Sequence, residues 1–258
     1  MTEKALSFDD LGFAYNTGDW VLRSYSGIVT RGETFSILGP NGCGKTTLLR
    51  LLIGALHAQE GSVTHDGRFA FVPQLFQVTF SYTVLDMVLM GRARKVGLFS
   101  TPSSRDEEAA LGALGRLDLA DLAERPFDEL SGGQRQLVIF ARALATEADI
   151  LILDEPTSSL DLRNQGIILE WIERLSKKEG LTVVFTTHHP HHAYAVSDTT
   201  MLMLGENHYL CGPTHEVMTE AHLHDLYGVE LKRLAFEHKG RTMETFVPVY
   251  DMERSKGK

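Results

Sequence analysis

Residues 39–46 read Gly39-Pro40-Asn41-Gly42-Cys43-Gly44-Lys45-Thr46 and fit the phosphate-loop pattern Gly-x-x-x-x-Gly-Lys-[Ser/Thr] without a mismatch. The apolar run 35–38 before them predicts a strand, and the run 47–52 after them predicts a helix. Glycines let successive backbone N–H groups point into one concavity, and a helix N-terminus adds positive potential there. A glycine-rich turn can match the pattern by chance, but the flanking strand and helix favour a phosphate-binding loop.

Two adjacent carboxylates, Asp154 and Glu155, follow a second apolar run, Ile150-Leu151-Ile152-Leu153. Enzymes of phosphoryl transfer with such a loop hold Mg²⁺ on the loop Ser/Thr and on a carboxylate of a neighbouring strand, while the lysine contacts the phosphates. These roles fall to Thr46, Asp154 and Lys45. Glu155, one residue later, is placed to act as general base toward an attacking water. The alternative is that the acidic pair only ends a strand.

A second candidate anion site lies at Leu130-Ser131-Gly132-Gly133-Gln134, directly before a predicted helix. Backbone N–H groups at a helix N-terminus attract anions as the first loop does. Two cradles in one chain predict that each nucleotide lies between the first loop of one subunit and the Ser-Gly-Gly loop of another. The simpler interpretation is a capped helix start with Ser131 as N-cap. A kinase or GTPase would leave this string unexplained.

The composition indicates a folded acidic protein of 258 residues, 43% hydrophobic and 23% charged, with a net charge of −9. An acidic balance argues weakly against nucleic acid as a partner. The two cysteines, Cys43 and Cys211, form no legible disulfide framework, which fits a reducing cytosol. No stretch approaches the ~20 consecutive apolar residues of a membrane-spanning helix, so work at a membrane would require docking onto another chain.

The alternation of apolar runs with helical periods predicts an α/β fold. Residues 83–130 are helical in pattern and interrupt the strands, so we expect a helical insertion into the sheet. A hairpin is expected around Gly205-Glu206-Asn207. The predicted strands are 5–8, 13–15, 21–25, 34–38, 69–72, 150–153 and 182–185, and the predicted helices are 46–56, 134–145 and 164–178.

With these motifs the chain resembles the ATP-binding-cassette (ABC) ATPases over nearly all of its length. Residues 39–46 are similar to the family's Walker A motif, 150–155 to its Walker B motif and 130–134 to its signature loop. The resemblance implies ATP and Mg²⁺ as ligands and ATP hydrolysis as the activity.

The resemblance also implies a domain organisation. One ABC ATPase domain would span 1–258. Its P-loop NTPase core, of the RecA type with a mixed, mainly parallel sheet, and an N-terminal antiparallel β subdomain would comprise 1–80 and 148–258. Residues 81–147 would form the helical subdomain that carries the signature loop.

Four further positions match the family. Gln74 resembles the Q-loop glutamine, Asp161 the end of the D-loop Ser159-Leu160-Asp161, His188 the switch histidine and Tyr15 the aromatic that stacks on adenine. Taken singly, Tyr15 could be core or surface filler and Gln74 could cap a turn. The complete predicted site has catalytic residues Glu155, His188 and Gln74; ATP contacts from Tyr15, Gly39, Pro40, Asn41, Gly42, Cys43, Gly44, Lys45, Thr46, Thr47, Ser131, Gly132, Gly133, Gln134 and Asp161; and Mg²⁺ contacts from Thr46, Gln74 and Asp154.

His188 shares its segment with His189, His191 and His192, and such a cluster could indicate a metal site. Pro190 breaks the run, and no cysteine or acidic spacing completes a ligand set. We favour His188 as the switch histidine because it comes first after the strand 182–185, at the sheet edge where ligands gather.

Cys43 lies in a loop of converging N–H dipoles beside Lys45. Such surroundings favour the thiolate, the nucleophilic form of cysteine. We therefore expect Cys43 to be alkylated readily and to be protected by bound ATP.

The resemblance implies a homodimer on the cytoplasmic face of the inner (cell) membrane, with polytopic permease subunits, a periplasmic or extracellular substrate-binding protein and no nucleic acid. Three weaker strings, 83–92, 97–99 and 226–229, resemble subunits of importers for metal chelates: iron-siderophores, cobalamin or haem. Molybdate or tungstate importers of the same build remain an alternative, and a soluble ABC ATPase of DNA repair or translation is less favoured. The transported cargo contacts other subunits and not this chain, so there is little physical reason for this sequence to identify the cargo.

Overall fold

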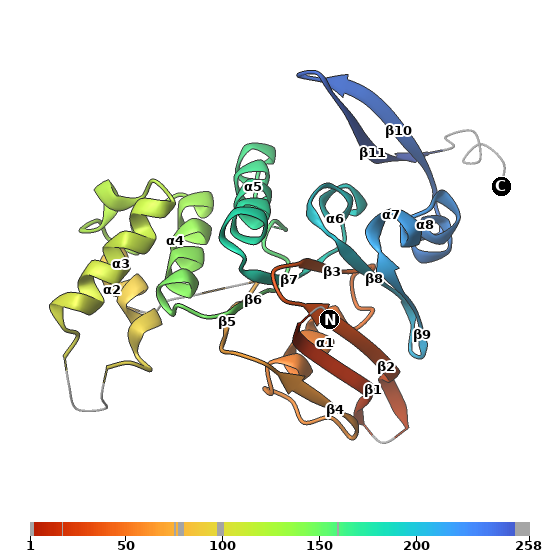
Figure 1. Cartoon of the computed structure of the whole chain (residues 1–258), viewed down its shortest axis with the longest axis horizontal. Coiled ribbons are helices and arrows are strands. Elements are labelled where there is room, and N and C mark those ends of the chain that lie inside the picture. The colour runs from red at the N-terminus through yellow and green to blue at the C-terminus, as the bar shows by residue number, and fades with distance from the viewer. Residues whose placement is uncertain are drawn as a thin grey trace.

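The computed structural model describes residues 3–16, 18–74, 76, 80–96, 101–158 and 160–250. A six-stranded sheet forms the central layer, with α5 and α6 on one face and α1 with a smaller antiparallel sheet on the other (Figure 1). The helices α2 to α4 lie beyond the β5 edge, and the chain ends in a separate hairpin, β10–β11. The predicted α/β class is confirmed.

The central sheet has the order β5-β6-β7-β3-β8-β9, parallel except for β9. Its inner strands read as nearly continuous apolar or Thr/Ser runs because both faces are covered. Every residue of β3, β6 and β7 is buried. The hairpin expected around residues 205–207 joins β8 to β9. The strands are β3 (Thr34–Leu38), β5 (Phe69–Val72), β6 (Ile150–Leu153), β7 (Thr182–Thr187), β8 (Thr199–Gly205) and β9 (His208–Pro213).

The smaller sheet has the antiparallel order β2-β1-β4. The predicted strands 5–8 and 13–15 belong to one long strand, β1 (Lys4–Asn16), whose register shifts between them. That irregularity, with Asp10 at φ 49°, hid the continuity from a pattern of period two. β2 spans Asp19–Thr30, and β4, Glu60–His65, was missed because its sequence is largely polar. The helix after the P-loop, α1 (Lys45–Leu52), is shorter than the predicted 46–56.

The helical part contains α2 (Val84–Leu89), η1 (Met90–Arg92), α3 (Ser104–Arg116), η2 (Ala120–Leu122), η3 (Phe127–Glu129) and α4 (Gly132–Ala145). Its buried apolar side chains share one core with α5 (Leu162–Glu179) and with the apolar residues of β5 and β6 on the same face. The string 97–99 lies outside the described residues. The division at residues 80 and 148 stays a prediction.

The C-terminal part holds α6 (Pro190–Val196), α7 (Thr214–Val217), α8 (Glu220–Tyr227) and the antiparallel pair β10 (Glu230–His238) and β11 (Arg241–Val249). The sequence analysis did not predict this second hairpin. Its base packs on α6 and α8 through a small core of its own.

A buried guanidinium holds the end of η1. Arg92, 4% exposed, donates to Asp106 Oδ1 at 3.1 Å, to the Ala145 carbonyl at 2.9 Å and to Glu147 Oε1 at 2.7 Å. Asp106 also accepts hydrogen bonds from Ser103, and these bonds together with Arg92 lower the pKa of Asp106 to about 2. One side chain thus joins η1 to the start of α3 and to the end of α4.

We expect Arg92→Met to lower the free energy of unfolding by about 2–4 kcal/mol, because the buried acceptors lose their donor while the apolar stem remains. The matched control is Arg94→Met, two residues away and exposed, which should change it by less than about 0.5 kcal/mol. Urea unfolding of the three proteins measures both values. Equal effects of the two substitutions would contradict the role given to Arg92.

Candidate nucleotide-binding site

A depression of about 730 Å³ opens where β3, β5, β6 and β7 end, beside the start of α1. Ligands gather at this edge of a parallel sheet because loops and helix N-termini meet there. Ten of the lining residues were predicted from the sequence, and two, Val21 and Ser158, were not. The lining consists of Tyr15, Val21, Asn41, Gly42, Gly44, Lys45, Thr46, Thr47, Gln74, Glu155, Ser158 and His188.

The phosphate loop has the backbone that its glycines were expected to allow. Gly42 and Gly44 have φ of 84° and 103°, values that disfavour any residue with a Cβ. Gly44 caps α1, so the N-terminus of that helix faces the depression. Lys45 Nζ donates to the carbonyls of Gly39 and Pro40, each at 2.9 Å. The loop therefore holds the ammonium group through two of its own carbonyls.

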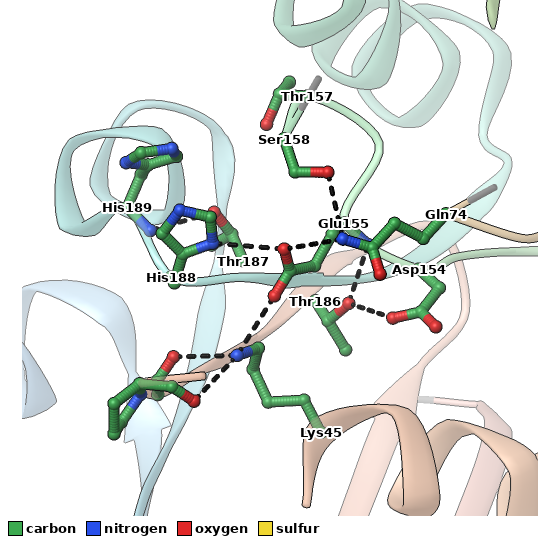
Figure 2. A network of polar contacts seen from close by, with 12 residues as sticks. Lys45, Gln74, Asp154, Glu155, Thr157, Ser158, Thr186, Thr187, His188 and His189 are labelled. Carbon is green, nitrogen blue, oxygen red and sulfur yellow. Dashed lines mark hydrogen bonds and ion pairs between the residues drawn. The ribbon is translucent and has the colours of Figure 1, made fainter. Parts of the chain in front are cut away.

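Glu155 lies at the centre of a network of polar contacts (Figure 2). Its Oε1 forms an ion pair with Lys45 Nζ at 3.1 Å, and its Oε2 contacts His188 Nδ1 at 3.1 Å and Gln74 Nε2 at 3.3 Å. Gln74 Nε2 also reaches Ser158 Oγ at 3.2 Å. The Lys45 and Glu155 side chains are only 4% and 9% exposed, so each charge needs the other as its partner. The structure thus brings together all three residues predicted to be catalytic.

The backbone of Glu155 has φ 44°, which is unusual for a residue with a side chain. Its N–H donates to Thr186 Oγ1 at 2.8 Å, and that hydroxyl donates to Asp154 Oδ1 at 2.8 Å. Thr46 Oγ1 donates to the same carboxylate oxygen at 3.2 Å. Burial raises the pKa of Asp154. Thr186 was missed, although its place at the end of a strand beside β6 is the signal that could have identified it.

Tyr15 lies at the rim of the depression. Its hydroxyl is 3.2 Å from Thr47 Oγ1, and its ring packs edge-on against Phe13, with centroids 5.0 Å apart. The residue is 55% exposed, so a ring face is open to a base.

The signature string is not part of the depression in this chain. Ser131 caps α4: its Oγ accepts from the Gln134 N–H at 3.3 Å, and Gln134 Oε1 accepts from the Ser131 N–H at 3.1 Å. Asp161 caps α5 by accepting from the Asn164 N–H at 2.8 Å. A Cβ on Gly133 would lie 2.5 Å from the Asn164 side chain, so the two helix starts adjoin. Ser159 lies outside the described residues.

The rings of the four histidines, His188 to His192, contact one another in tilted or edge-to-face arrangements. Burial, with the neighbouring imidazoles, lowers the pKa of His189 to about 4 and of His192 to about 3. His192 Nδ1 lies 3.1 Å from Thr157 Oγ1, a buried contact. No group of three or more His, Cys, Asp or Glu side chains in the described part of the chain could hold a metal ion. Of the four, His188 makes the contact with Glu155.

The expectation of a thiolate at Cys43 is wrong. Burial raises the pKa of this thiol, and the effect outweighs the opposing effect of Lys45. A Cβ on Gly39 would lie 2.6 Å from Cys43 Sγ, which shows that the sulfur points back under the loop.

Comparison with known proteins agrees with this geometry. The sequence profile of the ABC transporter family matches residues 22–158, just over half of the chain. The chain belongs to this family.

The ABC chain is 40% identical to the molybdate import ATP-binding protein MolC of Haemophilus influenzae, over 96% of this chain and 97% of that protein. It is 34% identical to an ATP-binding protein assigned to iron chelatin transport in Helicobacter pylori, over 91% and 97%. A solved transporter assigned to the metal-chelate type, in an inward-facing conformation, matches with a TM-score of 0.92 and 40% identity, over 96% and 98%. The chain is therefore the ATPase subunit of an ABC transporter that includes membrane components.

We expect alkylation of Cys43 in the ABC subunit to be slow at neutral pH and to accelerate as pH rises toward the raised pKa, since only the thiolate reacts. A maleimide time course at pH 7 and pH 9, with the adducts mapped by mass spectrometry, measures this. Cys211, whose pKa is raised to about 11 by desolvation of the thiol, provides an internal comparison. Rapid, pH-independent labelling of Cys43 would contradict the raised pKa.

Proposed function

We propose that the chain acts as a homodimer that binds Mg–ATP in two shared sites and drives import of a metal-containing cargo. The observation that supports this most is the separation of two phosphate cradles. Lys45, Glu155, His188 and Gln74 surround one depression, while the Ser131 loop does not line it. A second copy would supply the missing loop.

In this proposal ATP binds with its adenine on Tyr15 and its phosphates on the loop 39–46. The β- and γ-phosphates would take the place beside Lys45 that Glu155 occupies here. Anions of the ligand would then neutralise the ammonium, and Glu155 would be free to turn toward water. Binding therefore both loads the substrate and releases the base.

The oxygens of Thr46 and Asp154 fit Mg²⁺. They lie 3.2 Å apart, and Asp154 is 4% exposed and accepts hydrogen bonds from the hydroxyls of Thr46 and Thr186. Mg²⁺ prefers hard oxygen ligands of this kind. Gln74 Oε1 would be a further ligand once its amide leaves Glu155. Bound there, the ion would neutralise charge on the phosphates during transfer.

Glu155 and His188 would orient the water for in-line attack. Glu155 accepts its proton as general base, and the His188 contact at 3.1 Å holds the carboxylate in place. The Ser131 loop of the other copy, at the start of α4, would close over the γ-phosphate. Because ADP lacks that group, the closed dimer depends on ATP and opens after hydrolysis.

The cargo and the partners belong to the assembled system. None of the helices within the described ranges is long and apolar enough to cross a bilayer. We place the chain at the cytoplasmic face of the cell membrane, with its helical part against separate permease subunits and a substrate-binding protein outside. The resemblance to metal-chelate importers supports a metal chelate, and the 40% identity to MolC makes molybdate the alternative.

Glu155→Gln should lower steady-state ATP hydrolysis by about 10²–10⁴-fold, because the amide keeps the shape of the side chain and loses the base. ATP binding should persist, since the phosphate loop is intact. Glu173→Gln makes the same chemical change on the exposed side of α5 and should leave turnover unaltered. Turnover near that of the wild type in the Glu155 variant would rule out its role as base.

Ser131→Arg should abolish ATP-driven closure of the dimer while the isolated chain still binds ATP, because the substituted loop serves the other copy's nucleotide. The Lys45→Ala variant, in contrast, should lose the ability to bind ATP. Light scattering with ATP measures closure in each variant and in their mixture. In a mixed dimer one site combines the intact phosphate loop of the Ser131 variant with the intact signature loop of the Lys45 variant.

The mixture should therefore form some ATP-dependent dimer although neither variant does so alone. If Ser131→Arg alone dimerises normally with ATP, the shared site is wrong for this protein. If it loses ATP binding as a monomer, the loop serves its own chain.

A further inference from the structure

The C-terminal hairpin carries an apolar face that nucleotide binding does not use. β10 and β11 pair without a register shift, from Glu230↔Val249 at the base to His238↔Arg241 at the tip. Alternate residues of a strand point to the same face of a sheet. One face of the hairpin therefore gathers Leu234, Phe236, Met243, Val247 and Val249, each 40–50% exposed. We call this set the hairpin face.

The opposite side of the hairpin is already used at its base. Leu231 and Phe246, each 3% exposed, pack on α6 and α8, and Phe246 meets the Tyr194 ring edge-on at 5.1 Å. Beyond this contact the two strands extend past α6, away from the rest of the molecule (Figure 1). A two-stranded ribbon is marginally stable in water unless a face is packed. The exposed apolar side chains of the hairpin face are therefore of the kind that another surface covers in an assembly.

The register of the hairpin face is complementary to itself. Leu234↔Thr245 is the middle of the nine cross-strand pairs. A two-fold axis through this pair would set Lys232↔Val247 of one copy against Phe236↔Met243 of the other. Leu234 then meets Leu234 of the other copy, and Val247 meets Met243. The ammonium of Lys232 pairs with Glu230 at 2.8 Å and with Glu220 at 3.2 Å, and its apolar stem would lie over the Phe236 ring.

The charges at the two ends have opposite sign. The base borders a groove of about 780 Å³ with three carboxylates, Glu220, Asp225 and Glu230, against one ammonium, Lys232. The tip reads His238-Lys239-Gly240-Arg241. The same two-fold axis brings the cationic tip of each copy to the acidic base of the other. Neither an acidic nor a basic partner would match both ends, whereas a second copy does.

We propose that the hairpin face binds the same face of a second copy of this chain, antiparallel and across a two-fold axis. Such a contact is isologous, and packed sheets of this kind align within about 30°. It lies outside the nucleotide depression and needs no nucleotide. It therefore holds two ATPase copies together when their shared sites are open.

The matched pair Leu234→Lys and Ala235→Lys tests the contact, because the two neighbouring residues lie on opposite faces and both are exposed. Sedimentation equilibrium without nucleotide should show a dimer for the wild type. Leu234→Lys should raise its dissociation constant about tenfold or more, since an ammonium replaces an apolar group in the contact. Ala235→Lys, beside Glu244, should change it by less than about threefold. Thermal unfolding of each variant checks that the hairpin stays folded.

A charge exchange tests the orientation. Glu230→Arg and Arg241→Glu should each weaken the dimer, and the double variant should restore it, because the axis lays the Glu230↔Val249 pair of one copy over the His238↔Arg241 pair of the other. The same measurements in the Ser131→Arg background should be unaltered, which separates this contact from ATP-driven closure. The proposal would be overturned if the wild type stays monomeric without nucleotide, or if Leu234→Lys and Ala235→Lys have equal effects. The hairpin face would then bind a different partner.

Discussion

A polyphosphate can be held by backbone N–H groups only where several of them converge, and this constraint governs the architecture. The loop 39–46 meets it with Gly42 and Gly44 at positive φ and with the start of α1 behind them. The loop must follow a strand whose parallel neighbours end at the same edge, since the charged groups of the reaction have to come from those neighbours. β6 delivers Asp154 and Glu155, and β7 leads to His188. Other parts of the fold cover the two faces of this sheet.

The buried pair of Lys45 and Glu155 follows from that convergence. The Lys45 ammonium and the Glu155 carboxylate are both buried in the same depression, and a buried charge needs an opposite charge beside it. Each serves as the other's counter-ion at 3.1 Å, with the Gly39 and Pro40 carbonyls completing the shell around Lys45. Removing one partner from a buried pair is costly, so in the proposed function a phosphate would have to replace the carboxylate before the pair separates. The proposal thereby links occupancy of the loop to the freedom of Glu155.

The sequence was most informative where chemistry restricts the residue type. Glycine at positive φ, lysine, and a carboxylate after a buried strand leave few substitutes, so Gly42, Gly44, Lys45 and Glu155 could be named from their chemistry. Tyr15, Gln74 and His188 were named through the family resemblance. The sequence was less informative where a residue has its role only because of its position in the fold. Thr186, near the end of β7, and Ser158, in the turn after β6, are polar residues with no motif to mark them. Cys43 faces under the loop, a direction that only the backbone defines. β4 and the β10–β11 hairpin were missed because polar or largely exposed strands lack the alternation that marks a half-buried one.

The C-terminal segment is tied to the nucleotide site by its own contacts. The Tyr227 hydroxyl at the end of α8 donates to the His188 carbonyl at 3.0 Å, and the same helix leads directly into β10. Burial raises the pKa of Tyr227, so the hydroxyl keeps its proton as a donor. His192 on α6 adds a second tie, to Thr157 beyond Glu155. The helices α6 and α8, which support the hairpin, thus also contact the segments that carry His188 and Glu155. The hairpin is therefore connected to the carboxyl ends of β6 and β7.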